Sequence, residues 1–365
     1  MSLFKKLRLI YTGLTKPLKF SKKVSDRLYK KYLGHNKVIG WYRGYPVYST
    51  MSPPSLSPMF ANKNATFIMS GLQNRALPHL MDIAVTGACN CNCEHCSFTT
   101  KRSKKVELKK EEIIKAIKDS IDLGISALNL VGGEPLMRED LPHIISSIDK
   151  NLAVISIFTN GWFLKEKARE LKKAGLMAVK VSIDSPYPEV HDKLRKKSGL
   201  FNRAIGGLIE AKKQGLLTAI SCCITKKDLL DGSFEKIIKL GKKIGVNEII
   251  VFDAIPVGNF SHRSDLIADK PLLEDLIKIT NRYNSREDYP GIFVYSYIRS
   301  PRSMGCSGGV SYFYIDSYGN VFPCDFHNKS YGNIKSKPLY AIWDVMSRER
   351  NCSSYCGCEM KKEKS

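Results

Sequence analysis

The stretch TGACNCNCEHC, at residues 86–96, decides how the rest of this sequence is interpreted. It follows directly on a short apolar segment, and it holds four of the eleven cysteines of the 365-residue chain. Cys89, Cys93 and Cys96 have the spacing C-x3-C-x2-C. Three thiolates on one short loop can bind three irons of a cubane iron–sulfur cluster and leave the fourth iron open to a small molecule. The stretch therefore predicts a cluster-binding loop at the end of a strand.

Other uses of these cysteines are less favourable. An odd number of cysteines without an export signal makes a poor disulfide framework. A structural zinc ion needs four closed ligands, and a three-thiolate loop with no nearby fourth pair fits such a site badly. Cys91 offers the alternative spacing C-x-C-x2-C, which we consider the weaker ligand set. Cys222 and Cys223 lie on an apolar segment and are expected to be small core residues.

The chain is strongly basic, with a formal net charge of +23. This charge indicates either a lysine-rich solvated surface or an anionic partner such as nucleic acid, phospholipid or an acidic peptide. Residues 1–35 carry ten Lys or Arg against one acid, and apolar residues recur among them at helical spacing. Such an arm either lies on an anionic membrane surface or packs on the main domain. Because the sequence has no internal run of about 18 apolar residues and no recognisable secretory signal, we expect a cytoplasmic protein, with peripheral attachment to the inner face of the membrane as a variant.

Between residues 79 and 253, short apolar segments alternate with amphipathic segments. The apolar segments predict six strands, at 79–86, 127–131, 154–159, 178–183, 217–224 and 248–253. The segments between them predict five helices, at 109–123, 141–150, 165–174, 202–214 and 233–244. This order predicts an α/β fold with a parallel sheet and right-handed crossovers. Ligands of such sheets bind at the carboxyl ends of the strands.

The flanking regions are expected to depart from this alternation. Residues 36–78 are predicted to be irregular, with a small hairpin at 38–48 and a loop marked by Pro53, Pro54 and Pro58. After Asp253 the alternation is expected to stop. A helix at 272–283 then leads to a tail with a hairpin formed by 311–315 and 320–323. We therefore divide the chain into an N-terminal arm and irregular segment (1–78), a core (79–300) and a small cysteine-bearing hairpin and helix extension (301–365).

Polar and glycine-containing motifs follow several of the predicted strands. They are Gly132-Gly133-Glu134-Pro135, Thr159-Asn160-Gly161, Ser182-Ile183-Asp184, His191-Asp192-x-x-Arg195 and Pro256-Val257-Gly258. Glycines allow the backbone to approach a ligand closely, and a carboxylate suits an ammonium group. Each motif alone is a weak signal. Together with the cysteine loop, and in this order along the chain, they resemble the radical S-adenosylmethionine (SAM) superfamily.

This resemblance implies a partial (βα)6 parallel barrel in which Cys89, Cys93 and Cys96 hold a 4Fe–4S cluster, with His95 in the place of the family's aromatic residue. It also assigns SAM binding to the motif residues Gly132, Gly133, Glu134, Pro135, Thr159, Asn160, Ser182, Asp184, Arg195 and Gly258. The family's chemistry is reductive cleavage of SAM to a 5′-deoxyadenosyl radical, which abstracts hydrogen from a substrate C–H bond. It implies a low-potential electron donor of the flavodoxin or ferredoxin type.

The C-terminal cysteines resemble the SPASM/twitch extension of the same superfamily, in which a hairpin and a later loop bind an auxiliary 4Fe–4S cluster. Cys306 and Cys324 match the hairpin ligands, and two of Cys352, Cys356 and Cys358 would complete the set. Five cysteines are enough for one auxiliary cluster but not for two, which favours the single-cluster twitch form. A zinc site formed by the same tail is the alternative.

An auxiliary cluster at the mouth of the barrel would accept an electron from the substrate or supply one, so we expect a net oxidation or a crosslink. We expect the substrate to be a peptide or protein; a lipid, quinone-like or cofactor-precursor substrate at the membrane surface is the alternative. Nucleic acid is not expected, because the sequence contains no RNA-binding motif. A non-catalytic iron–sulfur electron carrier would explain the cysteines but not the SAM motifs. The sequence singles out no catalytic side chain.

Overall fold

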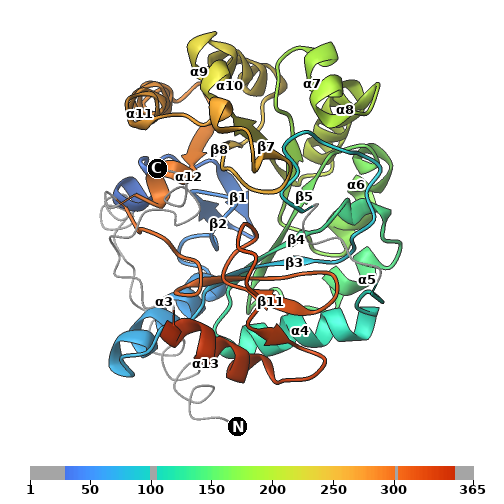
Figure 1. Cartoon of the computed structure of the whole chain (residues 1–365), viewed down its shortest axis with the longest axis vertical. Helices are drawn as coiled ribbons and strands as arrows, with labels where there is room; N and C mark the ends of the chain where they lie inside the picture. Colours follow the sequence, from blue (N-terminus) through green and yellow to red (C-terminus); the bar gives the residue numbers. More distant parts are fainter. Residues whose placement is uncertain (1–28, 99–104, 301–302, 350–365) are drawn as a thin grey trace.

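The computed structural model describes residues 29–98, 105–300 and 303–349. Most of the basic arm, and the candidate ligands Cys352, Cys356 and Cys358, lie outside these ranges. Within them the chain forms an α/β fold around one ten-stranded sheet, with the strand order β12-β11-β10-β3-β4-β5-β6-β7-β8-β9 (Figure 1). No helix in the described part of the chain is long and apolar enough to cross a membrane.

The centre of the sheet consists of the six predicted strands, all parallel to their neighbours. They are β3 (Leu80–Ala84), β4 (Ala127–Val131), β5 (Val154–Thr159), β6 (Ala178–Ser182), β7 (Leu217–Ile224) and β8 (Glu248–Asp253). The predicted helices follow as α4 (Lys110–Leu123), α5 (Leu141–Ser146), α6 (Leu164–Lys173), α8 (Leu200–Lys213) and α10 (Ser233–Ile244). Two short helices were not predicted, α7 (Pro188–Arg195) and α9 (Lys226–Leu230). The sheet curves without closing, which confirms the predicted partial barrel.

The expectation that the alternation stops after Asp253 is wrong. Helix α11 (Lys270–Asn284) leads to β9 (Gly291–Val294), which pairs in parallel with β8 and extends the sheet by one more strand. The sequence of β9, GIFV, has only four residues, all of them buried. A segment this short carries too little periodicity to be recognised as a strand.

The C-terminal hairpin joins the same sheet at its other edge. Strand β10 (Tyr312–Ile315) pairs in parallel with β3, and β11 (Asn320–Phe322) and β12 (Gly332–Asn333) continue outward as antiparallel strands. The turn between β10 and β11 contains Gly319 at φ 91°, a conformation that glycine adopts without strain. Helix α13 (Leu339–Glu349) then packs over this edge, with Trp343 fully buried. The predicted hairpin is confirmed, and the structure fixes it directly to the first strand of the core.

The segment before the barrel is more regular than expected. Strands β1 (Gly40–Tyr42) and β2 (Tyr45–Val47) form the predicted hairpin, with Arg43 and Gly44 both at positive φ in its two-residue turn. Residues 58–72, predicted to be irregular, instead form the 15-residue helix α3 (Pro58–Leu72). Pro58 occupies the first turn of this helix, where its missing N–H costs nothing, and the Ser57 hydroxyl caps it by accepting from the Phe60 amide.

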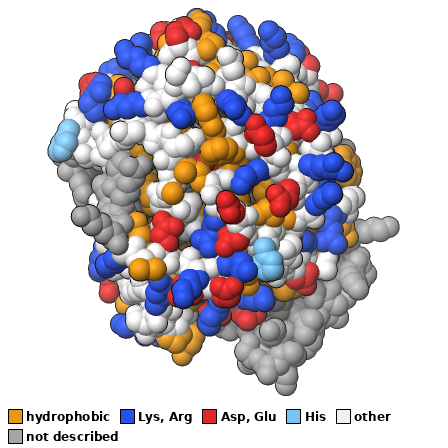
Figure 2. Space-filling view, turned by 90° about the vertical axis from the view of Figure 1, so that its right-hand side faces the viewer, with side chains coloured by type: hydrophobic (Ala, Val, Ile, Leu, Met, Phe, Trp, Pro, Cys, Tyr) orange, Lys and Arg blue, Asp and Glu red, His pale blue; other side chains and the backbone are white. Residues whose placement is uncertain are grey.

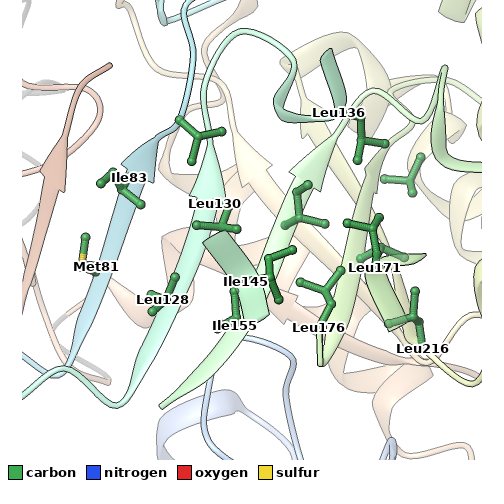
Figure 3. Close-up of a cluster of buried hydrophobic side chains, with 14 of the residues drawn as sticks. Met81, Ile83, Leu128, Leu130, Leu136, Ile145, Ile155, Leu171, Leu176 and Leu216 are labelled. Carbon is green, nitrogen blue, oxygen red and sulfur yellow. The ribbon is translucent and has the colours of Figure 1, made fainter. Parts of the chain in front are cut away.

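Two faces of the curved sheet have different roles. The outer face packs against the helices and forms the main hydrophobic core, to which β3, β4 and β5 contribute Met81, Ile83, Leu128, Leu130 and Ile155 (Figure 3). The inner face lines the barrel. Residues 39–59 cover the opening at the amino ends of the strands through contacts with Val154, Ala178 and Leu217, which begin β5, β6 and β7. This cover leaves the carboxyl ends of the strands as the open side of the barrel.

His35 provides a test of how tightly the segment before the barrel is held. Its side chain is 4% exposed, and burial followed by the nearby Lys37 lowers its pKa to about 4. The unfolded chain binds a proton here below its ordinary pKa of about 6.5, whereas the folded chain does not until about pH 4. Stability should therefore fall on acidification through this window, by up to about 1.4 kcal/mol per pH unit from this group. His35→Leu should reduce that slope in urea unfolding measured at several pH values, while exposed His262→Asn should leave it unchanged. An unaltered slope in His35→Leu would show that His35 is not buried in solution.

Candidate active site at the carboxyl ends of the strands

A cavity of about 260 Å³ opens at the carboxyl ends of the barrel strands. It brings together most of the residues that the sequence motifs singled out. They are Cys89, Cys93, Cys96, Gly132, Gly133, Glu134, Thr159, Asn160, Ser182, Asp184 and Arg195. Two of the predicted residues do not line the cavity. Pro135 is buried at the start of a 3-10 turn, and Gly258 lies against the backbone of Cys96.

The cysteine loop is held in place by backbone contacts with neighbouring elements. The amide of Glu94 donates to the Leu194 carbonyl at 2.9 Å, at the end of α7. On the other side, the Asn259 side chain donates to the Cys93 carbonyl at 2.9 Å, and the Asn259 amide donates to the Cys96 carbonyl at 3.1 Å. The loop is therefore positioned by segments that follow β6 and β8.

The glycines of the motif after β4 allow that strand to approach the cysteine loop. The Gly133 amide donates to the Thr86 carbonyl at 2.8 Å, and the Glu134 amide donates to the Ala88 carbonyl at 2.7 Å. A Cβ on Gly132 would lie 2.3 Å from the Thr86 oxygen. In the structure these glycines make room for the cysteine loop, and because both also line the cavity, their expected contact with a ligand stays a prediction.

Gly133→Ala tests this close approach. The added Cβ would lie 2.2 Å from the Ala88 carbonyl oxygen, so the loop must move. We expect a loss of about 1–3 kcal/mol in the free energy of unfolding, and a lower iron content after anaerobic reconstitution. Gly206→Ala is the matched control, because its Cβ would meet only the end of Lys165 at 4.0 Å inside helix α8, and helical Ala is favoured over Gly by up to about 1 kcal/mol. Equal iron content in both variants would contradict the proposed packing role.

Glu134 is buried at the bottom of the cavity, with 1% of its surface exposed. Its carboxylate accepts from the Thr159 hydroxyl at 2.6 Å, from the Asn160 amide at 2.7 Å and from the Leu136 amide at 3.0 Å. Burial raises the pKa of this carboxyl, against the effect of those three donors. A carboxylate has about four acceptor positions, so one remains for a further donor such as an ammonium group.

Asp184 and Arg195 form a buried ion pair across the cavity from Glu134. Arg195 Nε lies 2.6 Å from Asp184 Oδ2, and His95 Nε2 lies 3.5 Å from the same oxygen. Burial alone would raise the pKa of Asp184, but the Arg195 guanidinium holds it well below its usual range. The resemblance assigned both residues to SAM; the structure shows that they also hold each other.

The cysteine thiols have the chemistry that an iron–sulfur cluster requires. A hydrogen bond from the Cys91 thiol, aided by the Arg195 guanidinium, lowers the pKa of Cys93 to about 5 against the effect of burial. The pKa of Cys89 is also lowered by the adjacent Cys91, whose backbone amide donates to Cys89 Sγ at 3.4 Å. Thiolates are the ligand form of cysteine. Three thiolates on one loop fit a cubane, in which each thiolate binds its own iron.

A second cavity, of about 210 Å³, adjoins the first. Cys306 and Cys324 line it, together with Asp82 from β3 and Arg299. The residues common to both cavities are Val131, Phe158, Phe252, Asp325 and Phe326. The two predicted cysteines of the C-terminal hairpin therefore face the space next to the candidate SAM cavity. Sequence reasoning missed Asp82 and Arg299, although a charged residue within the apolar strand LMDIA was a signal for Asp82.

Beneath this second cavity the barrel contains a buried polar network. Lys180 donates to the Asn129 oxygen at 2.5 Å, and the Asn129 amide group donates to Asp82 at 2.6 Å. Glu248 acts on Lys180 through its charge, and it accepts from the Thr50 amide at 2.8 Å. Burial lowers the pKa of Lys180 to about 7 despite the nearby carboxylates, whereas burial, followed by Asp325, raises the pKa of Asp82 to about 7. Asp82, which lines the second cavity, therefore has a raised pKa, and Lys180, which lines neither cavity, has a lowered one.

Known proteins share both the sequence pattern and the fold. Residues 83–241 match the radical SAM superfamily, and residues 306–360 match SPASM, an iron–sulfur cluster-binding domain. The chain is 29% identical over 315 residues to an AdoMet-dependent heme synthase of Methanosarcina barkeri, covering 78% of this chain and 89% of the relative. It is 31% identical over 271 residues to a GTP 3′,8-cyclase of Nautilia profundicola, covering 69% and 82%.

A solved structure confirms the architecture. The fold matches Streptococcus suis SuiB bound to its precursor peptide SuiA, with a TM-score of 0.68 and 15% sequence identity, covering 89% of this chain and 82% of that one. The sequence matches confirm the family that the cysteine loop and the strand-end motifs indicated. The chain belongs to the radical SAM superfamily of enzymes, which use SAM and a 4Fe–4S cluster, and it carries a SPASM iron–sulfur cluster-binding domain.

Proposed function

We propose that this enzyme oxidises a substrate held between two iron–sulfur clusters. Cys89, Cys93 and Cys96 would hold the first cluster, and Cys306 and Cys324, with two of Cys352, Cys356 and Cys358, would hold the second. The observation that carries the proposal is the shared wall of the two cavities, in which Phe158 and Phe252 line both. A substrate between these cysteine groups would reach both sites.

When bound, the first cluster and SAM would supply a 5′-deoxyadenosyl radical to take one hydrogen atom from a C–H bond, and the second cluster would accept one electron, so that loss of one proton from the substrate completes a net two-electron oxidation or crosslink. The remaining acceptor position of Glu134 would orient the amino group of SAM. The buried Asp184–Arg195 pair would present fixed charges to its ribose and carboxylate, without reorganisation when SAM binds. Gly258 would bring the backbone close to the adenine.

The aromatic and apolar lining would protect the reaction from water. Phe158, Phe252 and Phe260 all border the first cavity. A carbon-centred radical reacts with most groups near it, so exclusion of solvent and close positioning of one C–H bond are the tasks left to the protein. Asp82, which lines the second cavity, would lie close to a substrate placed there.

We infer that the substrate is a side chain of a peptide or protein. The fold shared with SuiB, whose structure holds a precursor peptide, supports this choice. A cofactor precursor is the second candidate, because the sequence relatives are named heme synthase and GTP cyclase.

The test is anaerobic reconstitution with iron, sulfide, SAM and dithionite. Formation of 5′-deoxyadenosine is expected, and its absence would favour a non-catalytic electron carrier. Co-expression with short peptides encoded next to this chain should then give a product with two fewer hydrogens. A redox-neutral product would contradict the oxidation, and turnover of a small cofactor precursor without any peptide would favour the second candidate.

Cys324→Ala separates the two clusters. SAM cleavage should remain detectable, because Cys324 lies in the second cavity and outside the first, while oxidation of the peptide should fall at least about tenfold once the electron acceptor is impaired. Quantifying 5′-deoxyadenosine and oxidised peptide in the same reaction checks this. Equal loss of both products would contradict the separate roles.

A further inference from the structure

One aromatic side chain connects the cysteine loop with a group of cations. Trp162 packs against the buried side chains of Cys91, Cys93 and Leu200, and its backbone amide donates to the Asn160 side chain at 2.9 Å. Lys197 Nζ lies 4.3 Å from the centre of the Trp162 ring, and the guanidinium carbon of Arg203 lies 5.1 Å from it. Cations at these distances are attracted to the face of the ring.

Further lysines extend this group along the end of α7. Lys193 lies in the last turn of α7, and Lys196 follows it; both are exposed. Two carboxylates beside these cations are engaged: Asp192 accepts from the Gly199 and Phe201 amides at 2.6 and 2.8 Å, and Glu166 forms an ion pair with Arg203 at 2.6 Å. We call the surface formed by Trp162, Lys193, Lys196, Lys197 and Arg203 the Trp162 patch. It lies on the side of the molecule that carries α6, α7 and α8 (Figure 1), where basic side chains are spread among acidic and apolar ones (Figure 2).

The Trp162 patch is coupled to the cysteine loop through the backbone. The amides of Asn92 and Glu94 donate to the carbonyls of Arg195 and Leu194, which adjoin the patch lysines in sequence. In the described part of the chain, the five patch residues lie outside the sets that line the two cavities. A protein bound to the patch would therefore be close to the cysteines without displacing SAM or substrate.

We propose that the Trp162 patch is the docking site for a small acidic one-electron carrier protein that reduces the cluster on the Cys89–Cys96 loop. The proposal rests on the assignment of Cys89, Cys93 and Cys96 as ligands. In this step one electron leaves the reduced centre of the carrier and enters the cluster, and no atom is transferred. Lysines on the patch rim would steer an acidic partner, and a Trp–Arg centre is typical of the residues that dominate protein interfaces.

The experiment compares two double variants with the same change in net charge. Lys193→Glu/Lys197→Glu reverses the Trp162 patch. Lys115→Glu/Lys278→Glu is the control on α4 and α11, where both side chains are 76% exposed. Each variant is assayed for 5′-deoxyadenosine formation without substrate, once with a purified acidic flavodoxin and its NADPH-dependent reductase and once with dithionite. Calorimetric binding of oxidised flavodoxin to the full-length protein, before and after cluster reconstitution, provides a readout independent of activity.

We expect the patch variant to lose at least about tenfold in the flavodoxin-driven rate and in flavodoxin affinity, and the control to lose far less. The wild-type rate should also fall as salt is added, because salt screens surface charges. Equal losses in both double variants would overturn the proposal. A parallel loss of the dithionite-driven rate would also overturn it, because the effect would then lie in the cysteine loop. Unchanged flavodoxin binding, together with a loss of peptide modification under dithionite, would overturn it as well and would make the patch a peptide site. Failure of the wild type with dithionite would instead overturn the proposed function.

Discussion

Cys93→Ala is expected to abolish 5′-deoxyadenosine formation. Cys93 lies in the cavity with Glu134 and Arg195, and its lowered pKa favours the thiolate that an iron binds. Without this ligand the cubane loses one of its three protein attachments, and activation of SAM should fall by several orders of magnitude, to the background of the uncatalysed reaction. Iron and sulfide content, the visible absorption of the cluster and 5′-deoxyadenosine are measured after anaerobic reconstitution.

Two other cysteines provide matched controls for this variant. Cys222 is 1% exposed on β7 and belongs to the hydrophobic core, so Cys222→Ala should keep both the cluster and SAM cleavage. Cys91→Ala decides between the two sulfur spacings in the loop. It should retain the cluster if Cys89, Cys93 and Cys96 are the ligands. Loss of the cluster in Cys91→Ala, with retention in Cys89→Ala, would make Cys91 a ligand in place of Cys89.

Lys180→Met is expected to destabilise the fold by about 3–5 kcal/mol, because it leaves buried carboxylates without their cation. Lys180 is fully buried, and Asp82 and Glu248 are its charged neighbours. Burial brings the pKa of Lys180 down to about 7 and raises that of Asp82 to about 7, so both groups are charged together only around neutral pH. Above that range Lys180 has lost its proton in the wild type, and below it Asp82 has gained one, so the difference in free energy of unfolding between Lys180→Met and wild type should be largest near pH 7 and shrink on either side. Urea unfolding of the full-length protein at pH 6, 7 and 9 measures this dependence.

A triple variant separates charge from packing at this position. Lys180→Met/Asp82→Asn/Glu248→Gln removes the whole set of charges and should recover much of the lost stability, because replacing a complete buried ion group is far less costly than breaking it. Lys173→Met, at an exposed position on α6, should change stability by less than about 0.5 kcal/mol. If the triple variant were no more stable than Lys180→Met, the loss would come from packing rather than from unpaired charge.

The sequence was sufficient to predict the central strands and the residues of the candidate site, because the site residues directly follow strands that local hydrophobic periodicity identifies. Each strand from β3 to β8 is a short apolar run followed by polar or glycine residues, and parallel strands place those residues at one edge of the sheet. This is why Cys89, Glu134 and Asp184, which are far apart in sequence, line one cavity. The roles of the individual side chains toward SAM and the clusters stay predictions.

The edges of the sheet were harder to predict, because short or isolated elements carry little local signal. Strand β9 is four buried residues long, and β10 is recognisable as part of a hairpin but not as a neighbour of β3, a partner more than 200 residues away in the chain. Helix α3 was missed because its first residue, Pro58, was interpreted as a loop signal. The pairing partner decides that β9 and β10 are strands of this sheet, and the cap decides that α3 begins at Pro58; the residues of these segments alone do not.

By itself, the sequence determined the family, the cysteine loop and the strands that carry it, because these depend on residue spacing and hydrophobic period, which are local properties. Only the tertiary structure decided that Cys306 and Cys324 face the cavity beside the SAM motifs, that Asp82, Lys180 and Glu248 meet inside the barrel, and that Trp162 lies between the cysteines and a group of cations. These arrangements depend on which strands and helices become neighbours, and that choice is made by burial across the whole chain rather than by any single segment.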